Sequence, residues 1–227
     1  MLSGGENLTD HEVRARIEQI GIIPAIRVSS AEEAIFAATT VFHGGIKVVE
    51  ITTTVPAAAD VIAQLKRATP HCIVGAGTVL DMETARACLA AGADFLTSPG
   101  PDPDIVQLGA ASKVLVIPGA LTPSEVTLAW KAGAQLIKIF PCSLVGGPAY
   151  IKALKAPFPS VAFIASGGVN QQNTSDFIRS VACALGIGEE LVPHQAVQKR
   201  DATWIHELTR RFLGMVGEAR KKSGASH

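Results

Sequence analysis

The stretch IKVVEITTTVPAAADVIAQLKRATPHCIVGAGT, residues 46–78, contains two runs rich in β-branched residues with a helical stretch between them. The two runs, 46–52 and 72–78, are mainly apolar, which is typical of strands buried on both faces. Strands that alternate with helices form a parallel sheet. The stretch therefore predicts one strand–helix–strand unit of an α/β protein.

The same pattern recurs along the whole chain. Apolar, β-branched runs begin at eight points from residue 22 to residue 181, about 23 residues apart on average. This spacing is too short for two doubly wound domains and fits eight compact strand–helix units. We therefore predict an α/β fold of the (β/α)8 TIM-barrel type. Its strands are expected at 22–28, 46–52, 72–78, 93–98, 113–119, 134–140, 160–166 and 181–187.

Capping signals and the two chain ends complete the expected architecture. Ser30 with Glu33, and Thr122 with Glu125, have the spacing of capping boxes. Both pairs directly follow a predicted strand, so each is expected to start an outer helix.

The chain ends lie outside the repeating pattern. Residues 9–20 predict an extra helix within an N-terminal segment, 1–20, that covers the barrel floor. Residues 201–220 predict the last outer helix, and 221–227 predict a flexible tail. No linker or low-complexity stretch is found, so we expect a single barrel domain over 1–227.

Composition excludes several classes of function. Twenty Lys plus Arg balance twenty Asp plus Glu, and charged residues make up only 18% of the chain. We therefore expect no nucleic-acid partner and no attraction to an anionic membrane. No apolar run approaches the roughly 20 residues of a membrane span. The cysteines form no CxxC pair and follow no signal peptide, so they are expected to be buried thiols in a reducing cytoplasm; they are Cys72, Cys88, Cys142 and Cys183.

A lysine interrupts the apolar run 134–140. The strand period of two places Leu136, Lys138 and Phe140 on one side. Burial disfavours the ammonium form, and a neutral amine can attack a carbonyl to form a Schiff base. The alternative interpretation is a structural lysine that pairs with a buried carboxylate or extends to solvent.

Glu50 interrupts the run 46–52 in the same way, since Val48, Glu50 and Thr52 share one face. If Lys138 and Glu50 both face the barrel mouth, the carboxylate can transfer protons during carbinolamine formation and enamine protonation. A glutamate that only neutralises Lys138 is the alternative, and the two roles are compatible.

Glycine-rich segments end four of the predicted strands. Glycines let a ligand approach the main chain, and after the last two barrel strands they often form a phosphate cradle. Tight turns explain the same glycines equally well. The GAG segment lacks the full dinucleotide fingerprint and the six histidines lack metal-ligand spacing, so we expect no cofactor and no metal. The segments are GAGT 75–78, SPG 98–100, SGG 166–168 and GIG 186–188.

Several motifs occur together in a fixed order. They are Glu50, GAGTVL at 75–80, SPG at 98–100, KIFP at 138–141, GG at 167–168 and LVP at 191–193. Over roughly residues 10–220 the chain resembles the 2-keto-3-deoxy-6-phosphogluconate / 4-hydroxy-2-oxoglutarate aldolase family. The resemblance implies a metal-free, homotrimeric enzyme that cleaves a 2-keto-4-hydroxy acid to pyruvate and an aldehyde.

The resemblance also implies roles for individual residues. Lys138 corresponds to the Schiff-base lysine and Glu50 to the general acid/base. Thr78, Pro99 and Phe140 are expected to line the pyruvate-binding end.

The chain departs from the family pattern four residues after the glutamate. The family usually has an arginine there for carboxylate recognition, whereas this chain has Thr54, which supplies no charge. Arg27 is in phase with Ile23 and Ala25 at the end of the first predicted strand. We expect Arg27 to face the mouth and bind the anion; the alternative is an arginine on the surface.

A second departure lies at the phosphate cradle, where the family's usual Gly-Gly-Ser reads Gly188-Glu189-Glu190. A carboxylate repels a phosphate dianion at low dielectric constant but accepts hydrogen bonds from sugar hydroxyls. We therefore predict that an unphosphorylated or short-chain keto acid is used at least as well as the 6-phosphate. Alternatively, Glu189 turns to solvent and Gly167, Gly168 and Gly188 still bind phosphate.

The sequence thus predicts a class I aldolase, an aldehyde-lyase, for a 2-keto-3-deoxy sugar acid, with or without a 6-phosphate, or for 4-hydroxy-2-oxoglutarate. A phosphate-binding isomerase or synthase barrel, in which Lys138 contacts an anion, is one alternative. The other is a catalytically silent barrel that binds a sugar acid, which the absence of the arginine and the serine would suit.

Overall fold

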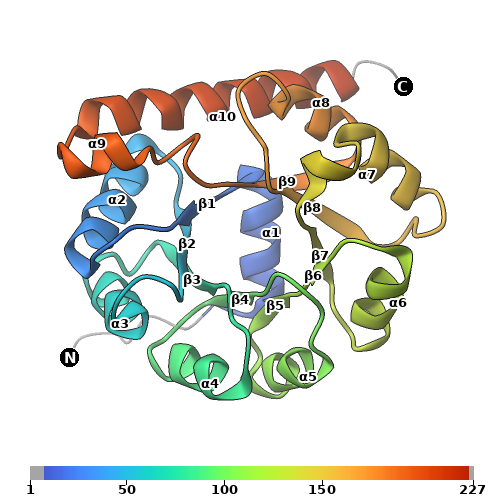
Figure 1. Ribbon diagram of the computed structural model, residues 1–227, viewed down its shortest axis with the longest axis horizontal. Coiled ribbons are helices and arrows are strands. Elements are labelled where there is room, and N and C mark those ends of the chain that lie inside the picture. Colours follow the sequence, from blue (N-terminus) through green and yellow to red (C-terminus); the bar gives the residue numbers. More distant parts are fainter. Residues whose placement is uncertain (1–7, 225–227) are drawn as a thin grey trace.

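A ring of parallel strands forms the centre of the molecule (Figure 1). The computed structural model describes residues 8–224. The strands are hydrogen-bonded in the order β5-β4-β3-β2-β1-β9-β8-β7-β6. Their bounds are β1 Ile22–Ile26, β2 Val48–Thr52, β3 Ile73–Gly77, β4 Phe95–Thr97, β5 Leu115–Ile117, β6 Gly119–Ala120, β7 Leu136–Ile139, β8 Ala162–Ser166 and β9 Ala182–Ile187.

The predicted run 113–119 forms two strands, β5 and β6, with Pro118 between them. Proline has no N–H to donate, which interrupts the ladder at that residue. Its carbonyl still accepts a hydrogen bond from the main-chain N–H of Lys138 at 2.9 Å. Because β5 and β6 are the two ends of the strand order and are joined through Pro118, the ring closes. The eight predicted strand positions and the TIM barrel are confirmed.

Helices surround the ring on its outer side (Figure 1). They are α2 Ala31–Gly44, α3 Ala58–Ala68, α4 Met82–Ala90, α5 Pro103–Ser112, α6 Pro123–Lys131, α7 Pro148–Lys155, α8 Thr174–Arg179, α9 His194–Gln198 and α10 Ala202–Gly224, with a 3-10 turn η1 at Cys142–Val145. All five residues of β2 and all five of β3 are buried, as expected for strands covered on both faces. None of the described helices combines the length and apolar character that crossing a membrane requires.

The two predicted capping boxes differ in the structure. Thr122 and Glu125 form a complete box at the start of α6. At α2 the hydroxyl of Ser30 accepts from the N–H of Glu33 at 3.2 Å, but the Glu33 carboxylate accepts from Ser29 instead. The capping box at α2 is therefore only half formed, because the N–H and hydroxyl of Ser29 offer the Glu33 carboxylate two donors.

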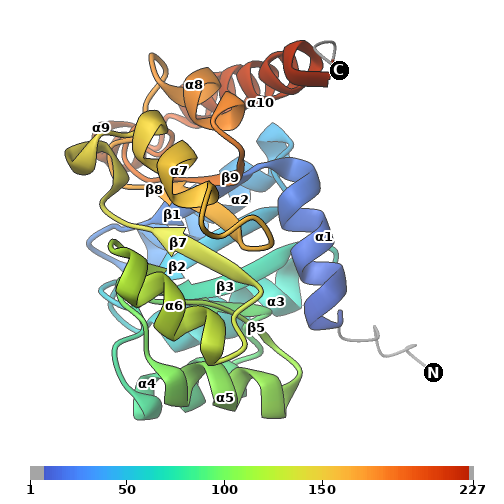
Figure 2. The ribbon, with the colours of Figure 1, turned by 90° about the vertical axis from the view of Figure 1, so that its right-hand side faces the viewer.

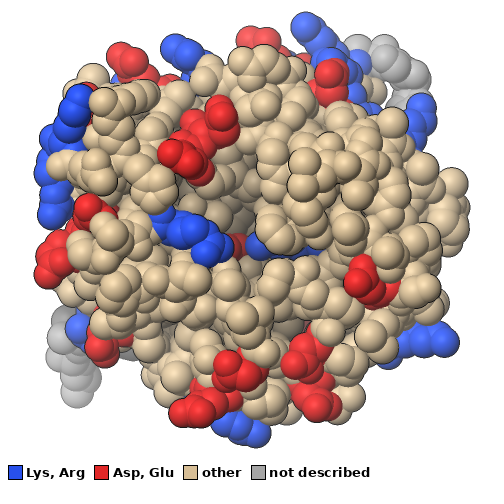
Figure 3. All heavy atoms as spheres, viewed as in Figure 1, with Lys and Arg blue, Asp and Glu red and all other residues tan. Residues whose placement is uncertain are grey.

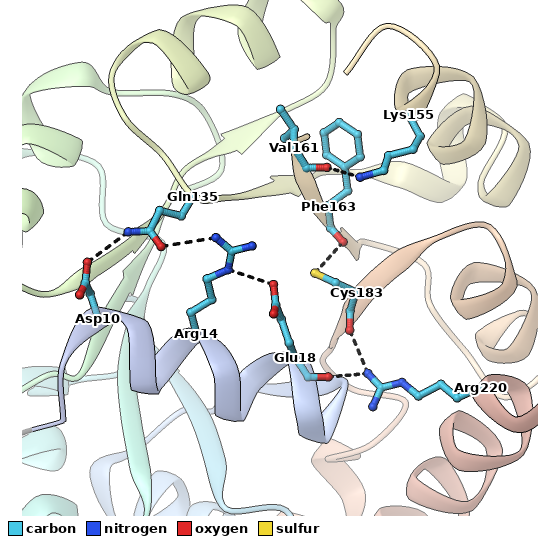
Figure 4. Close-up of polar contacts among 9 residues, drawn as sticks. All are labelled: Asp10, Arg14, Glu18, Gln135, Lys155, Val161, Phe163, Cys183 and Arg220. Atoms are coloured by element: carbon cyan, nitrogen blue, oxygen red, sulfur yellow. Dashed lines mark hydrogen bonds and ion pairs between the residues drawn. The ribbon is translucent and has the colours of Figure 1, made fainter. Parts of the chain in front are cut away.

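The predicted extra helix is α1, Asp10–Ile20, which lies across one end of the barrel (Figures 1 and 2). Val13 and Ile17 are fully buried on its inner side. The first turns of α1 are hydrogen-bonded to Gln135, the residue that precedes β7 (Figure 4). The Gln135 amide donates to Asp10 at 3.2 Å and accepts from Arg14 at 3.4 Å. This end, where the strands begin, is referred to below as the floor.

The last helix closes the floor from the other side. The Arg220 guanidinium of α10 donates to the main-chain oxygen of Gln19 at 2.6 Å. It also donates to that of Glu18 at 2.6 Å and to that of Cys183 at 3.0 Å, as Figure 4 shows. It thereby pairs carbonyl groups that the end of α1 leaves open.

Helix α10 continues to Gly224, so residues 221–224 of the predicted tail are helical and the last helix is longer than the predicted 201–220. The Ser223 hydroxyl donates to the oxygen of Ala219 at 3.0 Å, which stabilises the last turn. Residues 225–227 of the predicted tail lie outside the described part of the chain.

Candidate active site

A cavity of about 350 Å³ opens at the carboxyl ends of the strands, opposite the floor. This end is referred to below as the mouth. Figure 3 shows it as a hollow with basic side chains (blue) at its sides and acidic ones (red) at its base and rim. The cavity is lined by Ala25, Arg27, Glu50, Lys138, Phe140, Ser166, Gly167, Gly168, Val169, Gly186, Gly188, Glu189 and Glu190.

Lys138 and Glu50 meet at the base of this cavity. The Nζ of Lys138 lies 3.7 Å from Oε2 of Glu50, with the side chains 12% and 5% exposed. Lys138 comes from β7, where it is paired in register with Gly119 and Ile164, and Glu50 comes from β2. Both side chains therefore face the same cavity at the mouth.

Two neighbours fix the position of the Glu50 carboxylate. The Thr97 hydroxyl of β4 donates to Oε2 at 2.8 Å, the same oxygen that faces Lys138. On the other side, a side chain at Gly77 would overlap Oε1, so glycine is required there for steric reasons. The carboxylate is thus held between a hydroxyl donor and bare main chain.

Arg27 lines the cavity, and a chain of hydroxyl groups orients it. Its guanidinium donates to the hydroxyl of Thr54 at 3.0 Å. The Thr52 hydroxyl donates to the oxygen of Ile26 at 3.0 Å and lies 2.9 Å from that of Thr54. Because Thr52 has one hydroxyl hydrogen, Thr54 must be the donor between them. Thr54 supplies no charge itself, but its hydroxyl positions the charged guanidinium of Arg27.

Thr78 is the second acceptor for Arg27, with a hydroxyl to guanidinium distance of 3.1 Å. Its φ of 60° is in the left-handed region, which is unusual for a β-branched residue. The Thr53 hydroxyl donates to the main-chain oxygen of Thr78 at 2.7 Å and helps to hold this conformation. Such strained residues cluster at binding sites.

Phe140 lines the cavity, whereas Pro99 does not. The ring of Phe140 lines the cavity, with its centroid 5.5 Å from Nζ of Lys138. Pro99 is not among the lining residues, and its main chain packs directly against Gly119. A side chain at Gly119 would overlap Pro99, so Pro99 contacts the strand beside Lys138 rather than the cavity itself.

The predicted glycines form one wall of the cavity. Gly167 and Gly168 have φ values of 85° and 81°, which favours glycine at both positions. Behind them, Cys142 donates to the oxygen of Gly167 at 3.4 Å, and burial raises the pKa of this thiol to about 11. At Gly188 a Cβ would make only an ordinary van der Waals contact, 3.8 Å from the oxygen of Ala25.

Sequence reasoning did not single out Thr97, Ser166 or Glu190. Thr97 stands next to Ser98 at the polar end of the predicted run 93–98, so it does not interrupt an apolar run as Glu50 does. Ser166 is only 8% exposed, and its hydroxyl has no hydrogen-bond partner among residues 8–224 although it lines the cavity. Glu190 was visible only as the neighbour of Glu189.

The arrangement can perform carbonyl chemistry. An amine at the base can attack an electrophilic carbon, a carboxylate beside it can move protons, and a guanidinium at the side can bind an anionic group. In the described part of the chain, no three His, Cys, Asp or Glu side chains are grouped so as to hold a metal ion.

A family model for KDPG and KHG aldolases matches residues 13–208, most of the chain. The chain belongs to the KDPG and KHG aldolase family. It is 33% identical over 204 residues to the 2-dehydro-3-deoxy-phosphogluconate aldolase of Treponema pallidum (strain Nichols), covering 88% of this chain and 96% of that one. The protein is therefore an aldolase, an aldehyde-lyase.

Solved structures agree with the sequence comparison. The KDPG aldolase of Legionella pneumophila superposes with a TM-score of 0.81 at 31% identity, covering 86% of this chain and 95% of that one. That structure contains pyruvate captured as a covalent carbinolamine intermediate. A designed cube-shaped cage made by fusing symmetric oligomeric domains gives a TM-score of 0.82 at 31% identity, covering 90% of this chain and 75% of that one. The chain is thus an aldolase of the Schiff-base class.

Proposed function

We propose that Lys138 is the residue that forms the Schiff base, with the keto carbon of a 2-keto-4-hydroxy acid. The amine attacks the carbonyl carbon and gives a carbinolamine, which loses water to form an iminium ion. The iminium ion then accepts the electron pair of the C3–C4 bond. This step releases an aldehyde and leaves an enamine of pyruvate on Lys138.

Glu50 moves the protons of this sequence. As a carboxylate it removes the proton of the C4 hydroxyl while the C3–C4 bond breaks, and it returns a proton to C3 of the enamine. Hydrolysis of the resulting iminium ion releases pyruvate and restores the amine. Thr97 keeps the carboxylate oriented for both transfers through its 2.8 Å hydrogen bond.

Arg27 binds the substrate carboxylate, with Thr54 and Thr78 holding its guanidinium in place. Phe140 covers the pyruvate end, with Pro99 supporting that end from behind Gly119. Gly167, Gly168, Gly188 and Glu189 bind the end of the substrate that becomes the aldehyde. The substrate is a 2-keto-3-deoxy sugar acid or 4-hydroxy-2-oxoglutarate.

The observation that carries this proposal is the pair of Lys138 and Glu50. Nζ of Lys138 and Oε2 of Glu50 lie 3.7 Å apart at the base of an open cavity, and both side chains are largely buried. A purely structural ion pair needs no cavity above it. Here the pair has free space on the side where a carbonyl compound would enter.

Borohydride reduction in the presence of pyruvate tests the assignment. An imine is reduced to a stable secondary amine, and mass spectrometry of the digested protein locates it. We expect one adduct, on the peptide that carries Lys138, and none in Lys138→Met. An adduct on Lys47 or Lys113 would contradict the assignment, and the absence of any adduct would contradict Schiff-base chemistry.

The working enzyme is proposed to be a homotrimer of single-domain barrels over residues 1–227. Large apolar side chains remain exposed on the single chain, among them Leu80 at 65% and Leu144 at 84%. Sedimentation equilibrium should give three times the 23.6 kDa mass of the chain. A cytoplasmic location is proposed because all four cysteines are free thiols, which suits a reducing compartment.

A further inference from the structure

Two carboxylates at the rim of the mouth have no partner. Glu189 and Glu190 line the cavity that contains Lys138, and both side chains are exposed. Neither makes a hydrogen bond or ion pair with any residue in the described range 8–224. The fold does not use these charges, so they are available to a ligand.

Main-chain donors lie next to the two carboxylates. The N–H groups of Gly168, Gly188 and Glu189 donate to no acceptor in the described chain. Gly188 lines the cavity, and a Cβ there would meet nothing closer than the oxygen of Ala25 at 3.8 Å, so its main chain is not covered by a side chain. This end of the cavity therefore presents both hydrogen-bond donors and negatively charged acceptors.

A ligand that carries several hydroxyl groups matches such a surface better than a phosphate group does. Each hydroxyl donates one hydrogen bond and accepts others, so it can bind a carboxylate and an N–H group together. A phosphate dianion only accepts, which satisfies the N–H groups and leaves the carboxylates facing a like charge.

The charge of the whole cavity acts in the same direction. Its charged lining residues are two cations, Arg27 and Lys138, and three anions, Glu50, Glu189 and Glu190. In the proposed function Arg27 is occupied by the substrate carboxylate, and the amine that attacks is uncharged. A second anionic group on the substrate would then find no free cation and two unpaired carboxylates.

We infer that Glu189 and Glu190 select substrates whose aldehyde-forming end is an unphosphorylated polyhydroxyl chain, and that they disfavour a terminal phosphate. This inference rests on the proposed function, because it concerns the same cavity. It assigns to the two residues a role in specificity and none in the chemical steps.

The test compares 2-keto-3-deoxygluconate with its 6-phosphate, which differ only in the terminal group. The ratio of kcat/KM for the two substrates is measured in the wild type, Glu189→Gln, Glu190→Gln and the double variant. Glu207→Gln is the matched control, since it removes an exposed carboxylate from α10, away from the cavity.

The wild type should use the unphosphorylated acid at least as well as the phosphate. Each single variant should shift the ratio toward the phosphate by about fivefold, the size expected of a partly solvated charge interaction, and the double variant by more. Added salt should shrink the wild-type discrimination, because it screens exposed charges. Glu207→Gln should leave the ratio unchanged.

A wild-type ratio that strongly favours the phosphate, or a ratio that the double variant leaves unchanged, would overturn the inference. Either result would still include pyruvate release and an imine trapped on Lys138, so the proposed function would stand. If neither substrate releases pyruvate and no imine is trapped, the proposed function itself fails.

Discussion

The floor and the mouth of the barrel both carry charged residues, but they use them differently. At the floor, Arg14 and Gln135 hydrogen-bond to each other and to the carboxylates of Glu18 and Asp10, and Arg220 donates to main-chain oxygens. At the mouth, Ser166, Glu189 and Glu190 have no partner within residues 8–224, and Lys138 and Glu50 are 3.7 Å apart.

This difference indicates where stability and function reside. A polar group that is already satisfied in the fold contributes to stability and offers nothing to a ligand. A group left without a partner beside a cavity has its hydrogen-bonding capacity available. Changes at the mouth should therefore alter activity with little effect on unfolding, and changes at the floor should do the reverse.

Removal of the Lys138 amine should have the largest effect. Lys138→Met keeps much of the side-chain volume and abolishes imine formation, so turnover should fall on the order of 10⁶-fold, as when other catalytic nucleophiles are removed. Pyruvate release measures the loss, and circular dichroism checks the fold. Lys152→Met, on the exposed side of α7, is the control. Substantial turnover by Lys138→Met would place the nucleophile elsewhere.

Glu50→Gln should have the next largest effect at the mouth. The amide keeps the shape of the carboxylate but cannot take up a proton, so turnover should fall by roughly 10²–10⁴-fold. Exchange of the pyruvate methyl protons with deuterated solvent, followed by NMR, isolates the step at C3. Near-normal exchange in this variant would show that another group moves the proton.

Arg220→Met tests the floor. The substitution leaves three main-chain oxygens without the charged donor that they now share, so the free energy of unfolding should fall by about 2–3 kcal/mol. Urea denaturation measures the loss, with the exposed Arg210→Met of the same helix as control. The folded enzyme should keep its kcat/KM. A large loss of activity without loss of stability would contradict the assignment of stability to the floor and of activity to the mouth.

The smallest predicted effect is a pH dependence shared by both ends. Burial raises the pKa of Cys142 at the mouth to about 11, and burial together with the Glu18 carboxylate raises that of Cys183 at the floor to about 12. The folded state therefore favours the protonated thiol, and the unfolded state ionises first. The stabilisation is fully present below about pH 8.5 and is lost as the pH rises toward 11.

The expected loss is about 2 kcal/mol per thiol at pH 10. Urea midpoints of the wild type, Cys142→Ala and Cys183→Ala are compared from pH 8 to pH 10, because the difference in slope isolates each thiol from other titrating groups. Identical slopes in all three proteins would contradict the prediction.

Local pattern was sufficient to predict most of the fold. Strands that are buried on both faces need continuous apolar runs, and these can be read in the sequence at 22–28, 46–52 and the six later positions. The same patterns gave Lys138 and Glu50, since a charged residue inside an apolar run is visible without any structure.

Other features depend on contacts between distant parts of the chain. The Thr97 hydroxyl of β4 donates to the Glu50 carboxylate of β2. Thr54, just after β2, accepts a hydrogen bond from Arg27, just after β1. The break at Pro118 and the extension of α10 to Gly224 also departed from the predicted bounds.

The sequence by itself determined the strand–helix repeat, the family and the two charged residues that face the mouth. Only the tertiary structure decided which groups meet there, which hydroxyls orient them and which carboxylates remain without a partner. The physical reason is that alternation along a strand fixes the face on which a side chain lies. Its neighbours across the barrel depend on strand register and on closure of the ring, which no single segment of the chain specifies.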